Sequence, residues 1–311
     1  MWLLLFCIAT LMAAPGCRRE AVAPVTEPWD EGWGAPQRVI VKGYDGNIME
    51  PFISRDNRWL LFNNLNAKPE NTNLHWAERV DDLHFRYRGE IAGVNTDALE
   101  GVPTLDRDGN LYFVSPRSYK ETLSLIHHAK WTDGVAWDVA LVPGLSELKP
   151  GRIQFDTEIS ADGDTLYSVD SSFGLFGIGG PKSADLFIAS RHDGSWARDP
   201  RSAGILQEIN TPDHLEYAAA ISADGLTLYF NRVATPLGSD SNPRIWVARR
   251  GAVGQPFGPP RCIRAIDGFV EGATVAPGDR TIYYHKKENG RFVLYRISRN
   301  SRENCNPECR Q

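Results

Sequence analysis

The stretch that decides the fold is ISADGLTLYF, residues Ile221–Phe230, in which two apolar runs flank a tight Asp-Gly turn. A near copy, ISADGDTLYS, occupies Ile159–Ser168. Three looser copies complete a set of five: PFISRDNRWLLF from Pro51, PTLDRDGNLYF from Pro103 and ATVAPGDRTIYY from Ala273. The aligned turn positions are 52, 54, 62 and 54 residues apart: Asp56, Asp108, Asp162, Asp224 and Gly278. A recurrence at this spacing indicates a repeat architecture.

Each copy has the pattern of a β-hairpin, with Gly or Asn supplying the positive φ that the turn requires. A third apolar segment follows every hairpin: LHWAER from Leu74, IHHAKW from Ile126, LFIASR from Leu186, IWVARR from Ile245 and LYRISR from Leu294. A less regular fourth segment comes next in each unit. Four antiparallel strands per unit make one blade of a β-propeller.

The ends of the repeat region predict how the ring closes. One strand, Gln37–Lys42, precedes the first hairpin, and only a third strand follows the last one. The N-terminal strand can therefore complete the last blade and leave no sheet edge exposed. We predict an all-β fold, a single β-propeller of five four-stranded antiparallel blades over residues 33–300, with residues 301–311 as a C-terminal tail.

The repeats also resemble a known family. A Ser-x-Asp-Gly turn followed by Leu-Tyr-Phe, with an acidic residue a few positions upstream, is similar to the WD40-like repeats of TolB-type exported bacterial proteins. The resemblance implies a β-propeller that serves as a binding platform. TolB-type propellers usually have six blades, but residues 17–32 and 300–311 are too short to supply another, so five is the favoured count.

The N-terminus has the pattern of an export signal. Residues 1–12 are apolar, a run shorter than the roughly 20 residues that span a bilayer. It ends in Ala13-Ala-Pro-Gly-Cys17, which resembles the lipobox of bacterial lipoproteins, in which the cysteine is acylated after cleavage. We predict a signal peptide over residues 1–16, lipidation at Cys17 and a flexible linker over residues 17–32. The alternatives are an ordinary cleaved signal, or an uncleaved anchor or misplaced start codon, and all of them export the protein. We expect a lipoprotein that is periplasmic or associated with the outer membrane.

Composition limits the partners. The formal net charge is −5, with 23% charged residues and no basic stripe, which argues against nucleic acid as the main partner. The glycine-rich stretch after Phe173 is not followed by the Lys-Ser/Thr of a phosphate-binding loop, and we expect no cofactor. The expected partners are an envelope protein or a glycan, together with the membrane through the lipid anchor, and we expect a monomer.

Three cysteines lie beyond the lipobox: Cys262, Cys305 and Cys309. In an oxidising compartment one disulfide would be permitted, joining Cys305 or Cys309 to Cys262 and leaving one thiol. The spacing Cys305-x3-Cys309 has no accompanying His or second Cys pair, so we expect no metal site.

Acidic residues recur where the chain enters the first strand of each blade: Glu50, Glu100, Asp156, Glu158, Glu216 and Glu271. On a propeller they would form an acidic ring around one end of the central channel. Such a ring could bind a cation, an amine or sugar hydroxyls, or hydrolyse a glycosidic bond if two carboxylates were suitably spaced. The competing interpretation, favoured by recurrence in every blade, is that each carboxylate accepts backbone hydrogen bonds and is structural.

Three long connections between the second and third strands are candidates for partner contact: Asn64–Asn73, Phe173–Pro181 and Val233–Pro243. In Phe173–Pro181 apolar residues, Phe173 and Phe176 among them, alternate with glycine in an expected surface loop. The segment is either a docking loop or lid, or it folds back onto the blade.

Two functions follow from these observations. The first is a non-catalytic exported binding or scaffold propeller that docks a protein or glycan at the cell envelope, with no catalytic residues. The alternative is a carbohydrate-active hydrolase with carboxylates at the channel mouth, which rests on fold analogy. The sequence leaves enzyme activity undecided and favours the first.

Overall fold

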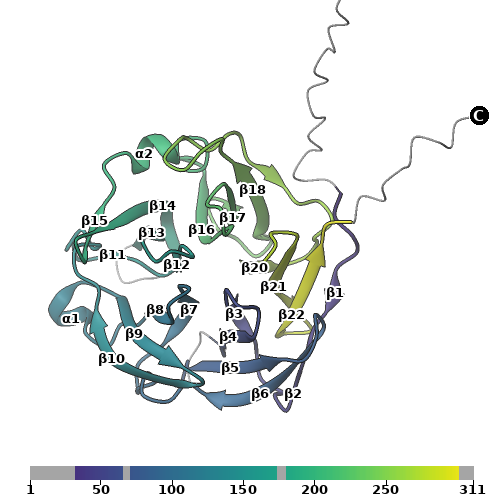
Figure 1. The fold of residues 1–311 in the computed structure, drawn as a ribbon. Helices are drawn as coiled ribbons and strands as arrows, with labels where there is room; N and C mark the ends of the chain where they lie inside the picture. The colour runs from purple at the N-terminus through teal and green to yellow at the C-terminus, as the bar shows by residue number, and fades with distance from the viewer. Residues whose placement is uncertain (1–31, 66–70, 174–179, 301–311) are drawn as a thin grey trace, which may run out of the picture.

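The structure is a computed structural model and describes residues 32–65, 71–173 and 180–300. Five small sheets stand in a ring, each with its first strand innermost (Figure 1). The innermost strands surround a narrow central channel, where a cavity of about 20 Å³ lies between Glu50, Phe52, Val102 and Asp156. The predicted five-bladed, all-β propeller is therefore confirmed. Among the residues described, no helix is long and apolar enough to cross a membrane.

The strands follow the predicted order from the channel outward. The innermost strands are β3 (Met49–Ile53), β7 (Gly101–Leu105), β12 (Thr157–Ile159), β16 (His214–Ile221) and β20 (Val270–Val275). The second strands are β4 (Trp59–Asn63), β8 (Asn110–Val114), β13 (Thr165–Phe173), β17 (Thr227–Ala234) and β21 (Thr281–Glu288). The third strands are β5 (Leu74–Arg79), β9 (Ile126–Thr132), β14 (Pro181–His192), β18 (Arg244–Arg249) and β22 (Arg291–Ser298). The outer strands are β6 (His84–Glu90), β10 (Val135–Leu141), β15 (Ser195–Arg198), β19 (Arg261–Cys262) and, for the last blade, β1 (Gln37–Arg38).

The ring closes through the N-terminal segment, as predicted, but this segment forms two strands rather than one. β1 pairs antiparallel with β22 in the last blade, whereas β2 (Ile40–Lys42) pairs parallel with β6 in the first. Between them, the Val39 N–H donates to the carbonyl of Leu294. The segment thus joins the first blade to the last. Outside the blade pattern lie β11 (Arg152–Ile153) and two short helices, α1 (Tyr119–Thr122) and α2 (Ser202–Ile205).

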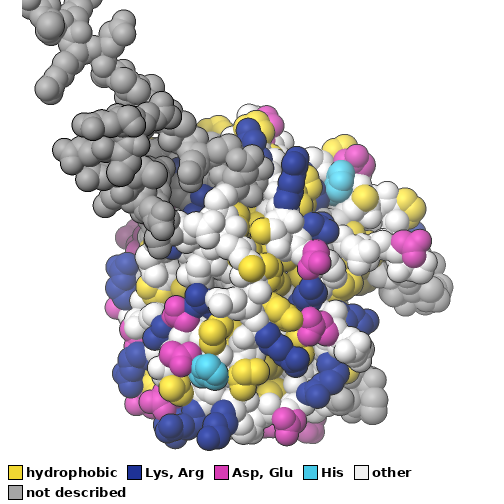
Figure 2. Space-filling view, turned by 90° about the vertical axis from the view of Figure 1, so that its right-hand side faces the viewer, with side chains coloured by type: hydrophobic (Ala, Val, Ile, Leu, Met, Phe, Trp, Pro, Cys, Tyr) yellow, Lys and Arg dark blue, Asp and Glu magenta, His cyan; other side chains and the backbone are white. Residues whose placement is uncertain are grey.

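The core consists of five buried apolar clusters, one between each pair of neighbouring blades. Leu and Phe of the opening motif contribute to the cluster between the third and fourth blades, where Leu228 and Phe230 are fully buried. On the rim shown in Figure 2, acidic and basic side chains are interspersed with apolar ones. The burial of apolar surface is therefore concentrated between blades, which fixes the positions of the channel-lining strands.

The Ser-x-Asp turns are a repeated structural device. In three blades a serine hydroxyl donates to the aspartate two residues later and accepts from the backbone N–H five residues later. In the fourth blade the distances are 2.6 Å from Ser222 Oγ to Asp224 Oδ1 and 2.8 Å from Thr227 N to Ser222 Oγ. In the second blade Asp106 replaces the serine and accepts from the N–H groups of Asp108 and Asn110. The opening motif is therefore scaffold.

Candidate functional site

The inner strands carry a bulge at one end of the channel. Pairing with the second strand shifts register at this point in four blades, and the residue there has positive φ: Glu50 (45°), Val102 (56°), Ala218 (51°) and Gly272 (61°). Each lies six residues before the turn position of its blade, and Asp156 holds that place in the third blade. A left-handed conformation at a non-glycine residue costs free energy, so it commonly marks a site under functional constraint.

The structure divides the predicted acidic ring into two groups. Glu100 and Glu216 each lie eight residues before the turn and are fully buried away from the bulge. Glu216 accepts hydrogen bonds from the hydroxyl and N–H of Thr211 and from Nε of Arg232 at 2.8 Å. Glu100 has the same pattern, with Thr96 and Arg117. For these two residues the geometry is that of a structural ion pair, which repeats between blades.

Glu158 is also held by structural contacts. Its Oε1 lies 2.9 Å from Nη2 of Arg55, across the channel from the first blade, and its Oε2 accepts from the Thr104 hydroxyl at 2.7 Å. Burial raises the pKa of Glu158, and the positive charge of Arg55 opposes that rise. The carboxylate therefore connects the third blade to the first and second through these contacts, and it has little remaining capacity to bind a ligand.

The other three acidic residues, Glu50, Asp156 and Glu271, come together, and we call them the channel trio. Burial raises the pKa of Glu50 well above its usual value, and the charges of Asp156 and Glu271 raise it further. Burial also raises the pKa of Asp156 to about 7, where the Ala218 N–H acts in the opposite direction and Glu271 adds to the rise. The geometry agrees with this repulsion, because Glu50 and Asp156 line one small cavity and His285 contacts both Glu50 and Glu271. The bulge position carries a carboxyl only in the first and third blades (Glu50 and Asp156), and Glu271 lies one position before the bulge of the fifth blade, so the trio breaks the repeat.

Hydrogen bonds orient the trio. Asp156 Oδ2 accepts from the Ala218 N–H at 2.9 Å, and Glu271 Oε1 accepts from the Tyr217 hydroxyl. His285 Nδ1 accepts from the Glu50 N–H at 3.1 Å, and its Nε2 lies 3.4 Å from Glu271 Oε2. A ring nitrogen that accepts a hydrogen bond carries no proton, so in this arrangement His285 is neutral and its Nε2–H points to Glu271. The pKa of Tyr217 lies well above its usual value because the side chain is buried and faces Glu271.

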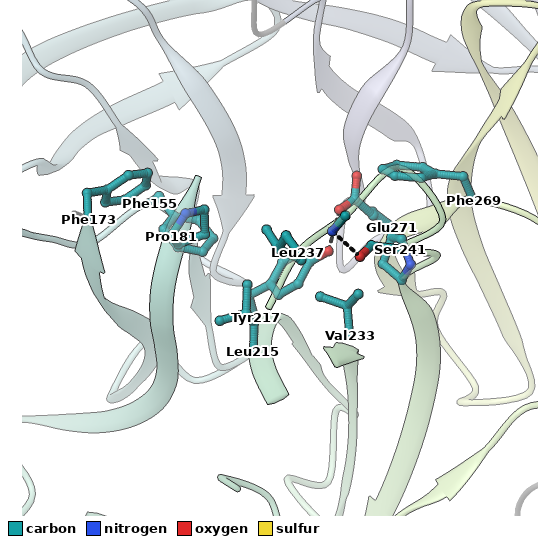
Figure 3. A pocket seen from close by; sticks show the side chains of 12 residues that line it. Phe155, Phe173, Pro181, Leu215, Tyr217, Val233, Leu237, Ser241, Phe269 and Glu271 are labelled. Carbon is teal, nitrogen blue, oxygen red and sulfur yellow. Dashed lines mark hydrogen bonds between the residues drawn. The ribbon is translucent and has the colours of Figure 1, made fainter. Parts of the chain in front are cut away.

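A cavity of about 400 Å³ opens beside Glu271, and we call it the loop-face pocket (Figure 3). Its walls come from the third, fourth and fifth blades and are mainly apolar: Phe155, Phe173, Leu215, Tyr217, Leu237 and Phe269. Figure 3 shows Phe155 and Phe173 on one side, Phe269 and Glu271 on the other, and Tyr217 between them. Its volume is within the range of small-ligand sites. Glu271, with a side chain 16% exposed, joins this pocket to the channel trio.

Two of the three predicted contact connections reach this pocket. Phe173, Pro181 and the segment around Leu237 and Ser241 line it, whereas the described residues of the Asn64–Asn73 connection do not. Phe176 lies outside the described residues, as do Cys17, Cys305 and Cys309, so lipidation and the disulfide stay predictions. Cys262 is partly buried on β19. Within the described ranges, no group of three His, Cys, Asp or Glu side chains is arranged to hold a metal ion.

Sequence reasoning missed Tyr217, His285, Phe155 and Phe269. Phe155, Tyr217 and Glu271 all lie seven residues before the turn position, so aligning the repeats by offset would have placed them at one level of the channel. The same alignment separates Glu100 and Glu216 from Glu50 and Asp156. His285 is on a second strand, β21, and no pattern in the sequence distinguishes it.

Comparisons with known proteins are informative about the fold. No protein-family model matches the sequence, and the search of curated proteins gives no match. A structure described as a glycoside hydrolase is similar at TM-score 0.55 and 12% identity, over 85% of this chain and 91% of the other. The catalytic domain of a GH62 α-L-arabinofuranosidase from Coprinopsis cinerea gives TM-score 0.51 and 12% identity, over 86% and 96%. TolB from Acinetobacter baumannii gives 0.46 and 14%, over 83% and 55%. At these identities the two likenesses with TM-scores above 0.5 show the fold alone, that of a β-propeller.

Proposed function

We propose that the chain is an exported, non-catalytic binding module whose loop-face pocket docks a protein of the cell envelope. The observation that carries this proposal is the pocket itself, an open cavity of about 400 Å³ with mainly apolar walls. A buried apolar core with aromatic side chains is typical of the centre of a protein-protein interface.

The lining favours a protein over a glycan. A sugar presents many hydroxyls, and a site that binds it needs several polar groups placed to receive them. Here the polar side chains are few: Glu271, Ser241 and the Tyr217 hydroxyl, which already donates to Glu271. An apolar side chain of a partner would fill this space without leaving hydrogen bonds unmade.

The proposal also includes export of the protein to the cell envelope. The apolar N-terminal run and the lipobox-like sequence ending at Cys17 support an envelope lipoprotein, held to the membrane through its acylated cysteine. A short lipid-anchored linker before residue 33 would leave the pocket accessible to neighbouring envelope proteins.

The test is affinity capture from envelope extracts with a matched pair of variants. Leu237→Asp places a charge in the pocket wall, at a side chain already 37% exposed. Leu148→Asp makes the same change at a residue 63% exposed and not among those that line the pocket. Wild type and Leu148→Asp should recover the same partner, and Leu237→Asp should lose it. Equal recovery by all three proteins would contradict docking at the pocket.

A second candidate, glycoside hydrolysis, is favoured by the channel trio. A carboxyl with a raised pKa can supply a proton at neutral pH, and Glu50 and Asp156 both have raised pKa values next to Glu271. Assay of a panel of nitrophenyl glycosides, furanosides included, separates the two functions. The binding module predicts no release of nitrophenol. If wild type releases nitrophenol and both Glu50→Gln and Asp156→Asn abolish the release, the protein is a hydrolase and the binding-module proposal is wrong.

A further inference from the structure

We propose that the partner segment bound in the loop-face pocket carries a protonated amine beside an apolar side chain, with the amine against the Glu271 carboxylate. The inference rests on the proposed docking function and names the chemistry that the pocket selects.

The apolar part of the occupant is set by the walls. Phe155, Leu215 and Leu237 present no hydrogen-bonding side-chain atoms, and Phe155 packs against Tyr217 with ring centroids 5.9 Å apart. An alkyl or aryl group entering between them exchanges water for apolar contact, which is favourable, whereas a polar group would lose its hydration.

The charge of the occupant is determined by the carboxyls at the Glu271 end of the pocket. Within the described residues, the charged neighbours that act on the Glu50 and Asp156 carboxyls are themselves carboxyls, including Glu271 for both. His285 brings no compensating charge while its Nδ1 accepts from the Glu50 N–H. Without an opposite charge, ionisation of these partly buried carboxyls is unfavourable, so the group favours entry of a cation, which would stabilise the ionised form.

Glu271 has the geometry to receive that cation. Its Oε1 accepts from the Tyr217 hydroxyl and its Oε2 faces His285 at 3.4 Å. A carboxylate can accept about four hydrogen bonds, so capacity remains for an ammonium group. Of the channel trio, Glu271 lines the loop-face pocket. An ammonium there would be a donor only, as this end of the pocket requires.

A bare metal ion fits less well than an amine. The described residues contain no group of three His, Cys, Asp or Glu side chains arranged for metal coordination. The apolar walls also supply no oxygen ligands, which hard cations require in numbers of six or more. An ammonium needs one good carboxylate contact and tolerates an apolar chain behind it.

The test compares two probes of nearly the same shape, phenethylamine and phenethyl alcohol, by ligand-observed NMR titration at millimolar concentrations and pH near 7. Wild type should bind the amine roughly tenfold more tightly or better, because a hydrogen bond to a charged group contributes about that much. In Glu271→Gln the amine should fall to the affinity of the alcohol, and the alcohol should be unchanged. The wild-type ratio is informative by itself, so the test does not depend on the stability of that variant.

The possible results distinguish the amine preference from the proposed docking function. If both probes bind wild type equally and Leu237→Asp abolishes their binding, the loop-face pocket remains the proposed docking site but the amine preference is overturned. Binding of neither probe would count against the pocket as a docking site and against the amine with it. A preference for the amine that persists in Glu271→Gln would also overturn the assignment to that carboxylate.

Discussion

Oδ2 of Asp156 accepts a hydrogen bond of 2.9 Å from the backbone N–H of Ala218, which lies 62 residues later in the chain and one blade further around the ring. This bond stabilises the ionised carboxylate, yet burial and the charge of Glu271 still raise the pKa of Asp156 to about 7. A carboxyl that is costly to ionise and lies at a channel mouth fits a role in binding rather than in stability.

Asp156→Asn should raise the free energy of unfolding above that of wild type by more at pH 8 than at pH 5. The folded-state pKa lies above the unfolded value of about 3.9, so the protonated carboxyl contributes stability that is fully present below that value and lost as pH rises through about 7. The variant has no such loss, and its advantage should grow by roughly 2–3 kcal/mol over that interval. Urea denaturation at both pH values measures it. Asp97→Asn, at an exposed position, is the control and should show no such change.

Arg232→Met should destabilise the protein by about 3 kcal/mol, because it leaves the fully buried Glu216 carboxylate without its charged partner. The further change Glu216→Leu should restore much of the loss, since a buried ion pair can often be replaced by apolar groups at little cost. Equilibrium urea denaturation gives both values. If the double variant is as unstable as the sum of the two single variants, the pair is not coupled and its structural assignment is wrong.

Ser222→Ala should cost about 1–2 kcal/mol. It removes the acceptor of the buried Thr227 N–H and the donor to Asp224, so one backbone group loses its partner. The control is Ser241→Ala, where the hydroxyl accepts from the Gly238 N–H in an exposed loop and water can take its place. Thermal denaturation of the two variants compares them. Equal losses would show that the turn serine has no special structural role.

The fold was predictable because its signals are local. Asp-Gly turns with alternating apolar residues recur in the sequence, and each recurrence, as at Asp162 and Asp224, marks one blade. The division of residues 37–42 between two blades was not predictable, since Val39 turns the chain from antiparallel pairing with β22 to parallel pairing with β6. That choice depends on tertiary contacts with strands more than 40 residues away in sequence.

The site was predictable only in part. The sequence identified all three members of the channel trio but grouped them with Glu100 and Glu216, whose offset from the turn differs by one or two residues. Side chains alternate along a strand and a bulge reverses that alternation, so a small difference in offset decides between channel and blade interior. The position of Tyr217 against Glu271 joins two blades 54 residues apart and required the structure.

Gly272→Ala is the sharpest test of the geometry around the channel trio. At φ 61° an added Cβ would lie 2.7 Å from Oε2 of Glu50 and 3.2 Å from its Cα, so the substitution combines backbone strain with a steric clash. Gly194→Ala is the matched control, because at φ 78° its Cβ would meet nothing within 4 Å and only the strain applies. The control should lose about 1 kcal/mol, and Gly272→Ala at least about 1 kcal/mol more, in urea denaturation. Gly272→Ala should also weaken binding of phenethylamine, since displacing Glu50 disturbs the carboxyls behind Glu271. Equal losses of stability would mean that Glu50 moves freely and that the trio is not held in a fixed arrangement.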